Sequence, residues 1–248
     1  MYYFIVLTGL IIGSELSVFV AGSFLFLQEK KLQTIATWLI SLAGGTMLGA
    51  AFLAMLPKAF NLASSPNGIL MLVLSGILFF FLLEKLILWR NCNNKDCERH
   101  QNASGPLILI GDSFHNAIDG IVIASAFLSS PELGWVVMLT VFAHEIPHKL
   151  GDFGVLIKNG FSRSAALWYN VLVGSTSLLF GSLAYFMMHA VNNVLPWILA
   201  FSAASFLYVS LADLVPQMHQ KSRPKDSLIQ ITLILTGIFI IYLVVHAR

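Results

Sequence analysis

The chain has 248 residues, of which 57% are apolar and only 10% are charged, and its fourteen Lys and Arg against twelve Asp and Glu give a formal net charge of +2. Soluble domains carry about 25% charged residues, so this composition excludes a soluble globular protein, and the near-neutral charge lacks the basic excess that nucleic-acid binding requires. The composition predicts an all-α polytopic membrane protein, in which residues 1–248 form a single transmembrane domain.

Eight apolar runs follow one another along the chain. A bilayer core about 30 Å thick is spanned by roughly 20 apolar residues in a helix, and backbone groups in lipid must bond within their own segment, so we expect each run to be a transmembrane helix. The links between the runs are short and leave no room for a separate soluble domain. The runs are residues 3–27, 33–57, 68–89, 106–129, 134–157, 164–189, 195–217 and 227–246.

The positive charges are concentrated in alternate links. Of the fourteen Lys and Arg, those in the links after the first, third, fifth and seventh runs are Lys30, Lys31, Arg90, Lys95, Arg99, Lys158, Arg163, Lys221, Arg223 and Lys225. Loops rich in Lys and Arg stay in the cytoplasm, so both termini are predicted to be non-cytoplasmic. Residues 91–105 are then a short cytoplasmic loop with two cysteines, Cys92 and Cys97, which together with His100 could hold a soft metal. A polar loop with two reduced thiols is the simpler interpretation.

The fourth and fifth runs contain ionisable residues at the depth of the membrane, within residues 111–120 and 144–153. Such side chains are costly in lipid and usually face a partner or a cavity. Residues four apart share one helix face, and a short link makes the two helices antiparallel neighbours. We therefore expect convergence near the bilayer midplane of four side chains that suit Zn²⁺ and related cations, namely His115, Asp119, His144 and His148.

Neighbouring positions extend this hypothesis. Asn116 and Glu145 each lie one residue further along and could line a second, adjoining site. Pro147 removes a backbone hydrogen bond and frees a carbonyl near the predicted ligands, which is tolerated in a membrane where the backbone lines a cavity. The alternative is a buried polar network that holds the helices together. The burial of seven acids and histidines in two stretches costs more free energy than helix packing alone would justify, so a metal pathway is favoured.

Residues 144–148, His-Glu-Ile-Pro-His, also fit the H-E-x-x-H pattern of zinc proteases, in which two histidines bind Zn²⁺ and the glutamate is the general base. An intramembrane zinc metalloprotease is therefore the alternative function. Proline is an awkward residue for a helix that must hold a rigid ligand pair. In addition, ligands from the fourth helix would fill the coordination position that a catalytic zinc keeps open for water.

The same residues carry a family resemblance. Residues 115–120 (HNAIDG) and 144–153 (HEIPHKLGDF) closely resemble the paired fourth- and fifth-helix signature of the ZIP (zinc–iron permease) transporters, in the subfamily with H-N-x-x-D-G and H-E-x-P-H-x-x-G-D motifs. The plan of eight helices with external termini is similar to that family along the whole chain.

The resemblance implies uptake of a divalent metal into the cytoplasm through a binuclear site between the fourth and fifth helices. The residues that match one metal position in the family are His115, Asp119, His144 and His148. Asn116 and Glu145, with shared ligands, match the other. The resemblance further implies a homodimer, and movement of the metal-carrying helices against the rest of the protein.

Two departures from the family pattern affect this expectation. The family motif has Glu where this chain has Lys149, a cation one turn beyond Glu145 that would pair with a carboxylate or repel a bound divalent ion. In the second helix, relatives often carry an Asp and a His in the stretch G-D-x-x-x-H-x-L-P, whereas this chain has Ala50 and Ala54. An accessory ligand on that helix is therefore absent.

Together these features predict a transporter and not an enzyme. We expect Zn²⁺ as the first cargo, with Fe²⁺, Mn²⁺ and Cd²⁺ as alternatives that ligand type does not separate. The metal is the transported ion and no cofactor is expected. The predicted partners are the lipid bilayer and a second copy of the chain, without nucleic acid, and the predicted location is the cell membrane, as a multi-pass protein of a bacterial inner membrane.

Overall fold

The computed structural model of the chain describes residues 2–27, 29–91, 100–188, 194–219 and 224–246. Within these ranges the regular elements are all helical, which confirms the expected all-α class there. In chain order they are α1 (Tyr2–Leu10), η1 (Ile11–Leu16), α2 (Ser17–Phe24), α3 (Glu29–Gly49), η2 (Ala50–Met55), α4 (Leu56–Leu62), α5 (Pro66–Asn91), α6 (His100–Ser129), α7 (Pro131–Lys158), α8 (Arg163–Met188), α9 (Leu195–Tyr208), η4 (Val209–Leu214), α10 (Val215–His219) and α11 (Pro224–His246), where η marks a π-helix.

Several elements continue one another, so the described chain forms eight helical rods. The first rod joins α1, η1 and α2, the second joins α3, η2 and α4, and the seventh joins α9, η4 and α10. Each predicted run overlaps one rod. The largest differences are at polar ends: the second rod begins at Glu29 and the fourth at His100, because hydropathy marks the apolar part of a helix and not its hydrogen-bonded ends.

Six segments of the described chain are long and apolar enough to cross a membrane, and they belong to the first, second, third, sixth, seventh and eighth rods. The remaining rods, α6 and α7, contain the ionisable stretches and are 30 and 28 residues long. At 1.5 Å per residue each reaches about 40 Å or more, which exceeds a bilayer core of about 30 Å.

The loop expected at residues 91–105 falls largely outside the described residues, including both Cys92 and Cys97. Helix α5 ends at Asn91 and α6 already begins at His100. Residues 100–105 of the expected loop are therefore helical, because a polar sequence at the start of a helix carries no apolar signal.

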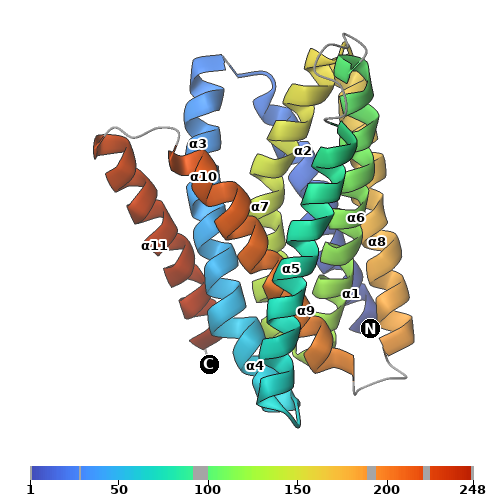
Figure 1. Cartoon of the computed structure of the whole chain (residues 1–248), viewed down its shortest axis with the longest axis vertical. Coiled ribbons are helices and arrows are strands. Elements are labelled where there is room, and N and C mark those ends of the chain that lie inside the picture. The colour runs from blue at the N-terminus through green and yellow to red at the C-terminus, as the bar shows by residue number, and fades with distance from the viewer. Residues whose placement is uncertain (1, 28, 92–99, 189–193, 220–223, 247–248) are drawn as a thin grey trace.

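The rods pack as two groups that meet around α7 (Figure 1). Helices α6 and α7 pack against each other, α8 packs along α6, and the first rod covers both α6 and α7. In the other group α3 packs on α11 and α5 packs on α9, while α3 against α7 and α9 against α6 connect the groups. The N-terminal and C-terminal ends of the described chain lie toward the same end of the bundle (Figure 1).

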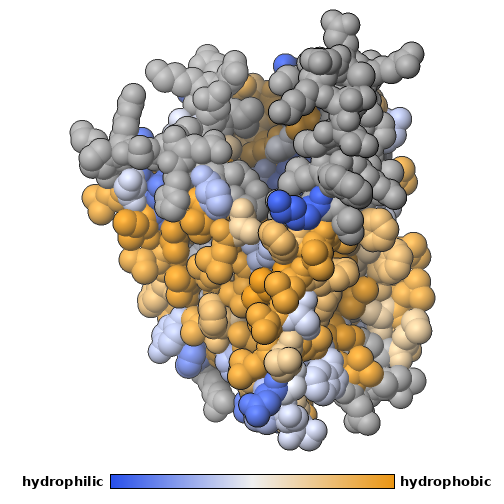
Figure 2. Space-filling model, in the orientation of Figure 1, coloured by the Kyte–Doolittle hydropathy of each residue, from blue (hydrophilic) through white to orange (hydrophobic). Residues whose placement is uncertain are grey.

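The surface of the bundle is apolar around its middle. On the face in Figure 2, hydrophobic side chains cover the middle of the molecule, and hydrophilic side chains gather toward its two ends. This distribution matches a protein whose central band contacts lipid and whose ends contact water.

The interior contains two apolar clusters with polar residues between them. On α7, Val141 belongs to the larger cluster, whereas Ile146 and Phe153 belong to the smaller one. Between Val141 and Ile146 lie His144 and Glu145, both buried. The polar residues are thus enclosed at mid-helix by packed side chains on either side along the bundle.

Gly120 sets the distance between α6 and α8. A Cβ atom at this position would lie 2.1 Å from the carbonyl oxygen of Ser177, which is far inside van der Waals contact. Only glycine permits this close approach, and Thr176 adds a hydrogen bond of 3.0 Å from its hydroxyl to the carbonyl of Ser113 on α6. The crossing fixes the helix that carries Asp119, the residue directly before Gly120.

Candidate metal centre

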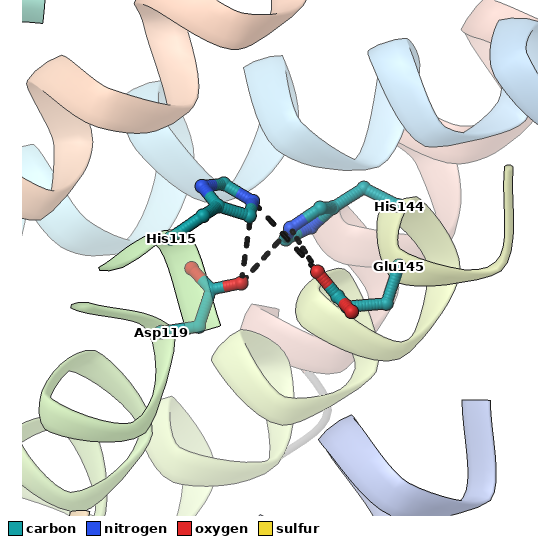
Figure 3. A group of neighbouring side chains, drawn as sticks. All are labelled: His115, Asp119, His144 and Glu145. Atoms are coloured by element: carbon teal, nitrogen blue, oxygen red, sulfur yellow. Dashed lines mark hydrogen bonds and ion pairs between the residues drawn. The ribbon is translucent and has the colours of Figure 1, made fainter. Parts of the chain in front are cut away.

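The ionisable stretches lie halfway along α6 and α7, and their side chains point toward one another across the helix pair. Two clusters of possible ligands form there. The inner group consists of His115, Asp119, His144 and Glu145, which Figure 3 shows converging from the two helices. The outer group, closer to the C-terminal end of α7, consists of Asp112, His148 and Asp152.

The inner group brings two imidazole nitrogens and two carboxylate oxygens together. The Nε2 atom of His144 lies 3.1 Å from Oδ2 of Asp119 and 3.9 Å from Oε1 of Glu145. The Nε2 atom of His115 lies 3.6 Å and 3.8 Å from the same two oxygens. Three of the side chains are buried, and that of His115 is 16% exposed.

These distances suit one tetrahedral metal ion. Zinc bonds of about 2.0–2.2 Å to nitrogen and oxygen place neighbouring ligand atoms about 3.3–3.6 Å apart in a tetrahedron. The four nitrogen-to-oxygen separations, from 3.1 to 3.9 Å, bracket that range, and the ligand atoms of the group all lie within 4.8 Å of one another. The donor set is therefore compatible with one Zn²⁺ ion.

Several buried atoms of the inner group also lack a hydrogen-bond partner among the described residues, namely Nε2 of His115, Oδ1 of Asp119 and Oε1 of Glu145. A buried polar atom without a partner is costly. The Nδ1 atom of His144 lies 3.0 Å from the carbonyl oxygen of Thr140. Since a carbonyl can only accept, Nδ1 carries a proton, and Nε2, which faces Asp119, is the ring nitrogen directed at the metal position.

The outer group lies one helical turn further along α7. The Nδ1 atom of His148 is 3.4 Å from Oδ1 of Asp112 and 3.5 Å from Oδ2 of Asp152. The side chain of His148 is 32% exposed, and its ring stacks on that of His115 at 5.2 Å between centroids. The outer group is therefore both adjacent to the inner group and accessible.

A cavity of about 200 Å³ opens beside both groups. It is lined by side chains of α7, α3 and the seventh rod, namely Ile40, His144, Pro147, His148, Gly151, Asp152, Val209 and Leu214. Gly151 has open space where a Cβ atom would stand. The cavity follows α7 from His144 toward Asp152, which is the direction of the helix end that carries Lys158.

A buried cation completes the centre. Lys149 is fully buried, and its Nζ donates to Oδ2 of Asp112 at 2.5 Å and pairs with Oε2 of Glu145 at 3.3 Å. Asn116, also fully buried, donates from Nδ2 to Oδ1 of Asp112 at 2.9 Å. Its Oδ1 accepts a hydrogen bond of 3.2 Å from Ser14 in η1.

All six residues expected as ligands lie in this region, but the structure groups them differently from the expectation. Glu145, expected in the second site, lies with His115, Asp119 and His144 in the inner group. His148, expected in the first site, belongs to the outer group. Asn116 belongs to neither group, because its amide is engaged at both ends.

Two contributions to the centre had no signal in the sequence. The carbonyl of Thr140 orients His144, and the buried ring of Phe206 on α9 meets the His144 imidazole edge to face at 5.6 Å. A backbone group has no residue type to reveal it, and a phenylalanine in an apolar run is indistinguishable from ordinary core. Asp112, by contrast, stood in the predicted polar stretch one turn before His115.

The family of the chain follows from comparison with known proteins. The family described as "ZIP Zinc transporter" matches residues 90–245, which include the whole centre and more than half of the chain. The chain belongs to the ZIP zinc transporter family. Zinc transporter ZIP13 of Pongo abelii is 32% identical over 219 residues, covering 83% of this chain and 65% of that protein.

Other ZIP relatives share a shorter region. Zinc transporter ZIP6 of Homo sapiens is 40% identical over 112 residues, which is 45% of this chain and 15% of that protein. Zinc transporter foi of Drosophila melanogaster is 36% identical over 139 residues, 56% of this chain and 20% of that protein. The chain thus spans about two thirds of ZIP13 and a much smaller part of the other two. These relatives are animal proteins and give no support to the predicted bacterial inner membrane.

Proposed function

We propose that this chain transports divalent metal cations, mainly Zn²⁺, through the inner group between α6 and α7. The observation that carries the proposal is the set of two imidazole nitrogens and two carboxylate oxygens at mid-helix, with nitrogen-to-oxygen separations of 3.1 to 3.9 Å and three of the four side chains buried. Three relatives of the chain are named as zinc transporters. Fe²⁺, Mn²⁺ and Cd²⁺ use the same donor types and are candidate cargoes as well.

We propose further that all eight rods cross the membrane and that both termini are non-cytoplasmic. Six segments have the required length and hydropathy, and α6 and α7 have the required length. Their ionisable residues face each other and not lipid, which lowers the cost of placing them in the bilayer. The described helix ends next to the cation-rich links lie at the end of the bundle opposite the described chain ends, in accord with the positive-inside rule.

The direction of transport is inward in this proposal. The cavity beside the centre runs along α7 toward the cation-rich, cytoplasmic end. Toward the other end, α6 and α7 are tightly packed: the buried ring of Phe127 fills the space beside Gly9 and Gly134, where a Cβ atom would lie 2.4 Å and 2.1 Å from it. We infer a state open to the cytoplasm, from which movement of α6 and α7 would expose the ion to the other side.

The protease alternative fits the geometry less well. It requires His144 and His148 on one zinc ion with Glu145 free to activate water. The ligand atoms of the two histidines belong to different groups, and Oε1 of Glu145 faces the inner histidines at 3.8 and 3.9 Å. Such a carboxylate is placed to bind the metal, which favours a transporter over an enzyme.

A homodimer is proposed from the family resemblance alone. Cross-linking of the protein in membranes followed by mass determination tests it: a dominant species of twice 27.3 kDa is expected. A population that remains monomeric at all cross-linker concentrations would contradict it.

Uptake of radioactive zinc into proteoliposomes tests the proposed function. The wild-type protein should carry zinc down its gradient, and His144→Ala should lose most of this flux because it removes one of four ligands. His246→Ala is the matched control, since His246 is an exposed histidine at the end of α11 whose Nδ1 lies 2.9 Å from the carbonyl oxygen of Tyr242 on the same helix. Equal zinc flux through wild type and His144→Ala would refute the proposed pathway.

A further inference from the structure

Lys149 is an unusual residue for the centre of a membrane protein. It is among the largest fully buried side chains of the described chain, and burial of an ammonium group is costly unless anions surround it. Its Nζ lies 2.5 Å from Asp112 and 3.3 Å from Glu145. The ammonium group thus stands where two carboxylates from two different helices converge, as a bound metal ion would.

The two oxygens of the Glu145 carboxylate face two different positions, one for a metal ion and one occupied by the ammonium group of Lys149. Its Oε1 faces the imidazoles of His115 and His144, at 3.8 and 3.9 Å, and so belongs to the metal position of the inner group. Its Oε2 faces Nζ of Lys149 at 3.3 Å. Glu145 is therefore a bridging carboxylate with a metal position on one side and a fixed ammonium on the other.

Two of the groups that could complete a second metal site next to Glu145, namely Asn116 and Asp112, are already engaged. Asn116 donates through Nδ2 to Asp112 at 2.9 Å and accepts through Oδ1 from Ser14 at 3.2 Å. Asp112 uses Oδ2 for Lys149. A second divalent ion adjoining the inner group would have to displace this ammonium or lie in direct contact with it.

Formal charge leads to the same conclusion. The two groups contain four carboxylates, and with Lys149 their formal charge is −3. One bound divalent ion changes the formal charge from −3 to −1, whereas two bound ions would make it positive in a buried, low-dielectric site. Exchange of Lys149 for Glu would change the formal charge by two units, which is the charge of one divalent ion.

We propose that the ammonium of Lys149 takes the place of a second metal ion, so that each chain binds a single transported cation, held by the inner group. The inference rests on the proposed function and replaces the binuclear site expected from the sequence by a mononuclear one. The outer group shares Asp112 with Lys149 and binds the ion only weakly on its path to the cytoplasm.

The test counts zinc ions on the purified full-length protein after saturation and removal of loosely bound metal. One Zn²⁺ per wild-type chain is expected. Lys149→Glu removes the ammonium and supplies a carboxylate, so two Zn²⁺ per chain are expected, a twofold increase. Lys31→Glu is the matched control, because the same charge reversal at an exposed residue of α3 should leave the count at one.

Two Zn²⁺ per wild-type chain, or a folded Lys149→Glu protein that still binds one, would overturn the inference. If Lys149→Glu does not fold, the wild-type count still decides. Zinc flux measured on the same preparations separates the two proposals: flux that depends on His144 together with two bound ions overturns only the single-ion site. Absence of flux in the wild type overturns the proposed function instead.

Discussion

At the scale of single residues, His144 is held from three sides. Its Nδ1 donates to the carbonyl of Thr140, the ring of Phe206 packs against its imidazole, and its Nε2 faces Asp119 at 3.1 Å. These contacts fix the orientation of the ring and direct Nε2 at the metal position, which reduces the ordering required when a metal binds. Asp119 supplies negative charge at the same point.

Asp119→Asn tests the importance of that charge. The substitution keeps the size of the side chain but removes the anionic oxygen, so zinc affinity should fall at least about tenfold. Competition with a fluorescent zinc chelator measures this affinity. Asp226→Asn is the control, since Asp226 lies in the first turn of α11 outside the centre and should leave the affinity unchanged. An unaltered affinity in Asp119→Asn would remove Asp119 from the ligand set.

The sequence predicted which residues gather at the centre but not how they divide into groups. Helical spacing correctly paired His115 with Asp119, which lie on one face of α6. In an antiparallel helix pair, a step forward on α7 corresponds to a step backward on α6, so His144 meets Asp119 while His148, one turn later, stacks on His115 and reaches Asp112. That register depends on the packing of the two helices and cannot be read from spacing within either one.

At the scale of elements, the position of α6 depends on its contact with α8. The ligand-bearing face of α6 is turned toward α7, and a neighbouring face approaches α8 so closely that the Cβ of any other residue at Gly120 would collide with the Ser177 carbonyl. A glycine directly after Asp119 therefore has a structural role in positioning the helix that carries this ligand.

Gly120→Ala should loosen this contact. Overpacking at a tight crossing costs about 1–3 kcal/mol, so the melting temperature in detergent and the zinc affinity should both fall. Gly154→Ala on α7 is the control: nothing lies within 4 Å of its added Cβ, and alanine there should raise helix stability by up to about 1 kcal/mol. Equal thermal stability of the two variants would show that the close approach at Gly120 is not limiting.

The π-helical segments are elements that hydropathy does not reveal. Both η2 and η4 end two residues before a proline, Pro57 in α4 and Pro216 in α10. Proline lacks the N–H that would close the preceding turn, and a wider turn upstream accommodates the missing bond. The prolines and their apolar surroundings can be read from the sequence. The change from α-helical to π-helical backbone hydrogen bonding depends on local packing and cannot.

At the scale of the whole molecule, the architecture was largely predictable because lipid imposes one strong pattern. The eight apolar runs each overlap a helical rod, and the described helix ends next to the cation-bearing links lie toward one end. Helix ends were less predictable, as the extension of α6 back to His100 illustrates. Polar residues there continue the hydrogen-bonded helix beyond the apolar part.

The proposed sidedness can be measured with single cysteines at the two ends. In a background with Cys92 and Cys97 replaced by serine, Ser64→Cys lies between α4 and α5, and Ser162→Cys lies between α7 and α8; both positions are exposed. A membrane-impermeant maleimide should label Ser64→Cys in intact cells and Ser162→Cys only after permeabilisation. Labelling of both residues, or of Ser162→Cys alone, in intact cells would contradict the proposed orientation.

The most direct test of the account is the coordination of bound zinc in the full-length protein. X-ray absorption at the zinc edge should reveal four nitrogen and oxygen ligands at about 2.0–2.2 Å, two of them imidazoles, as the inner group provides. In His144→Ala the same spectrum should lose one imidazole contribution. Sulfur ligands at about 2.3 Å, or a wild-type spectrum identical to that of His144→Ala, would contradict a metal centre between α6 and α7.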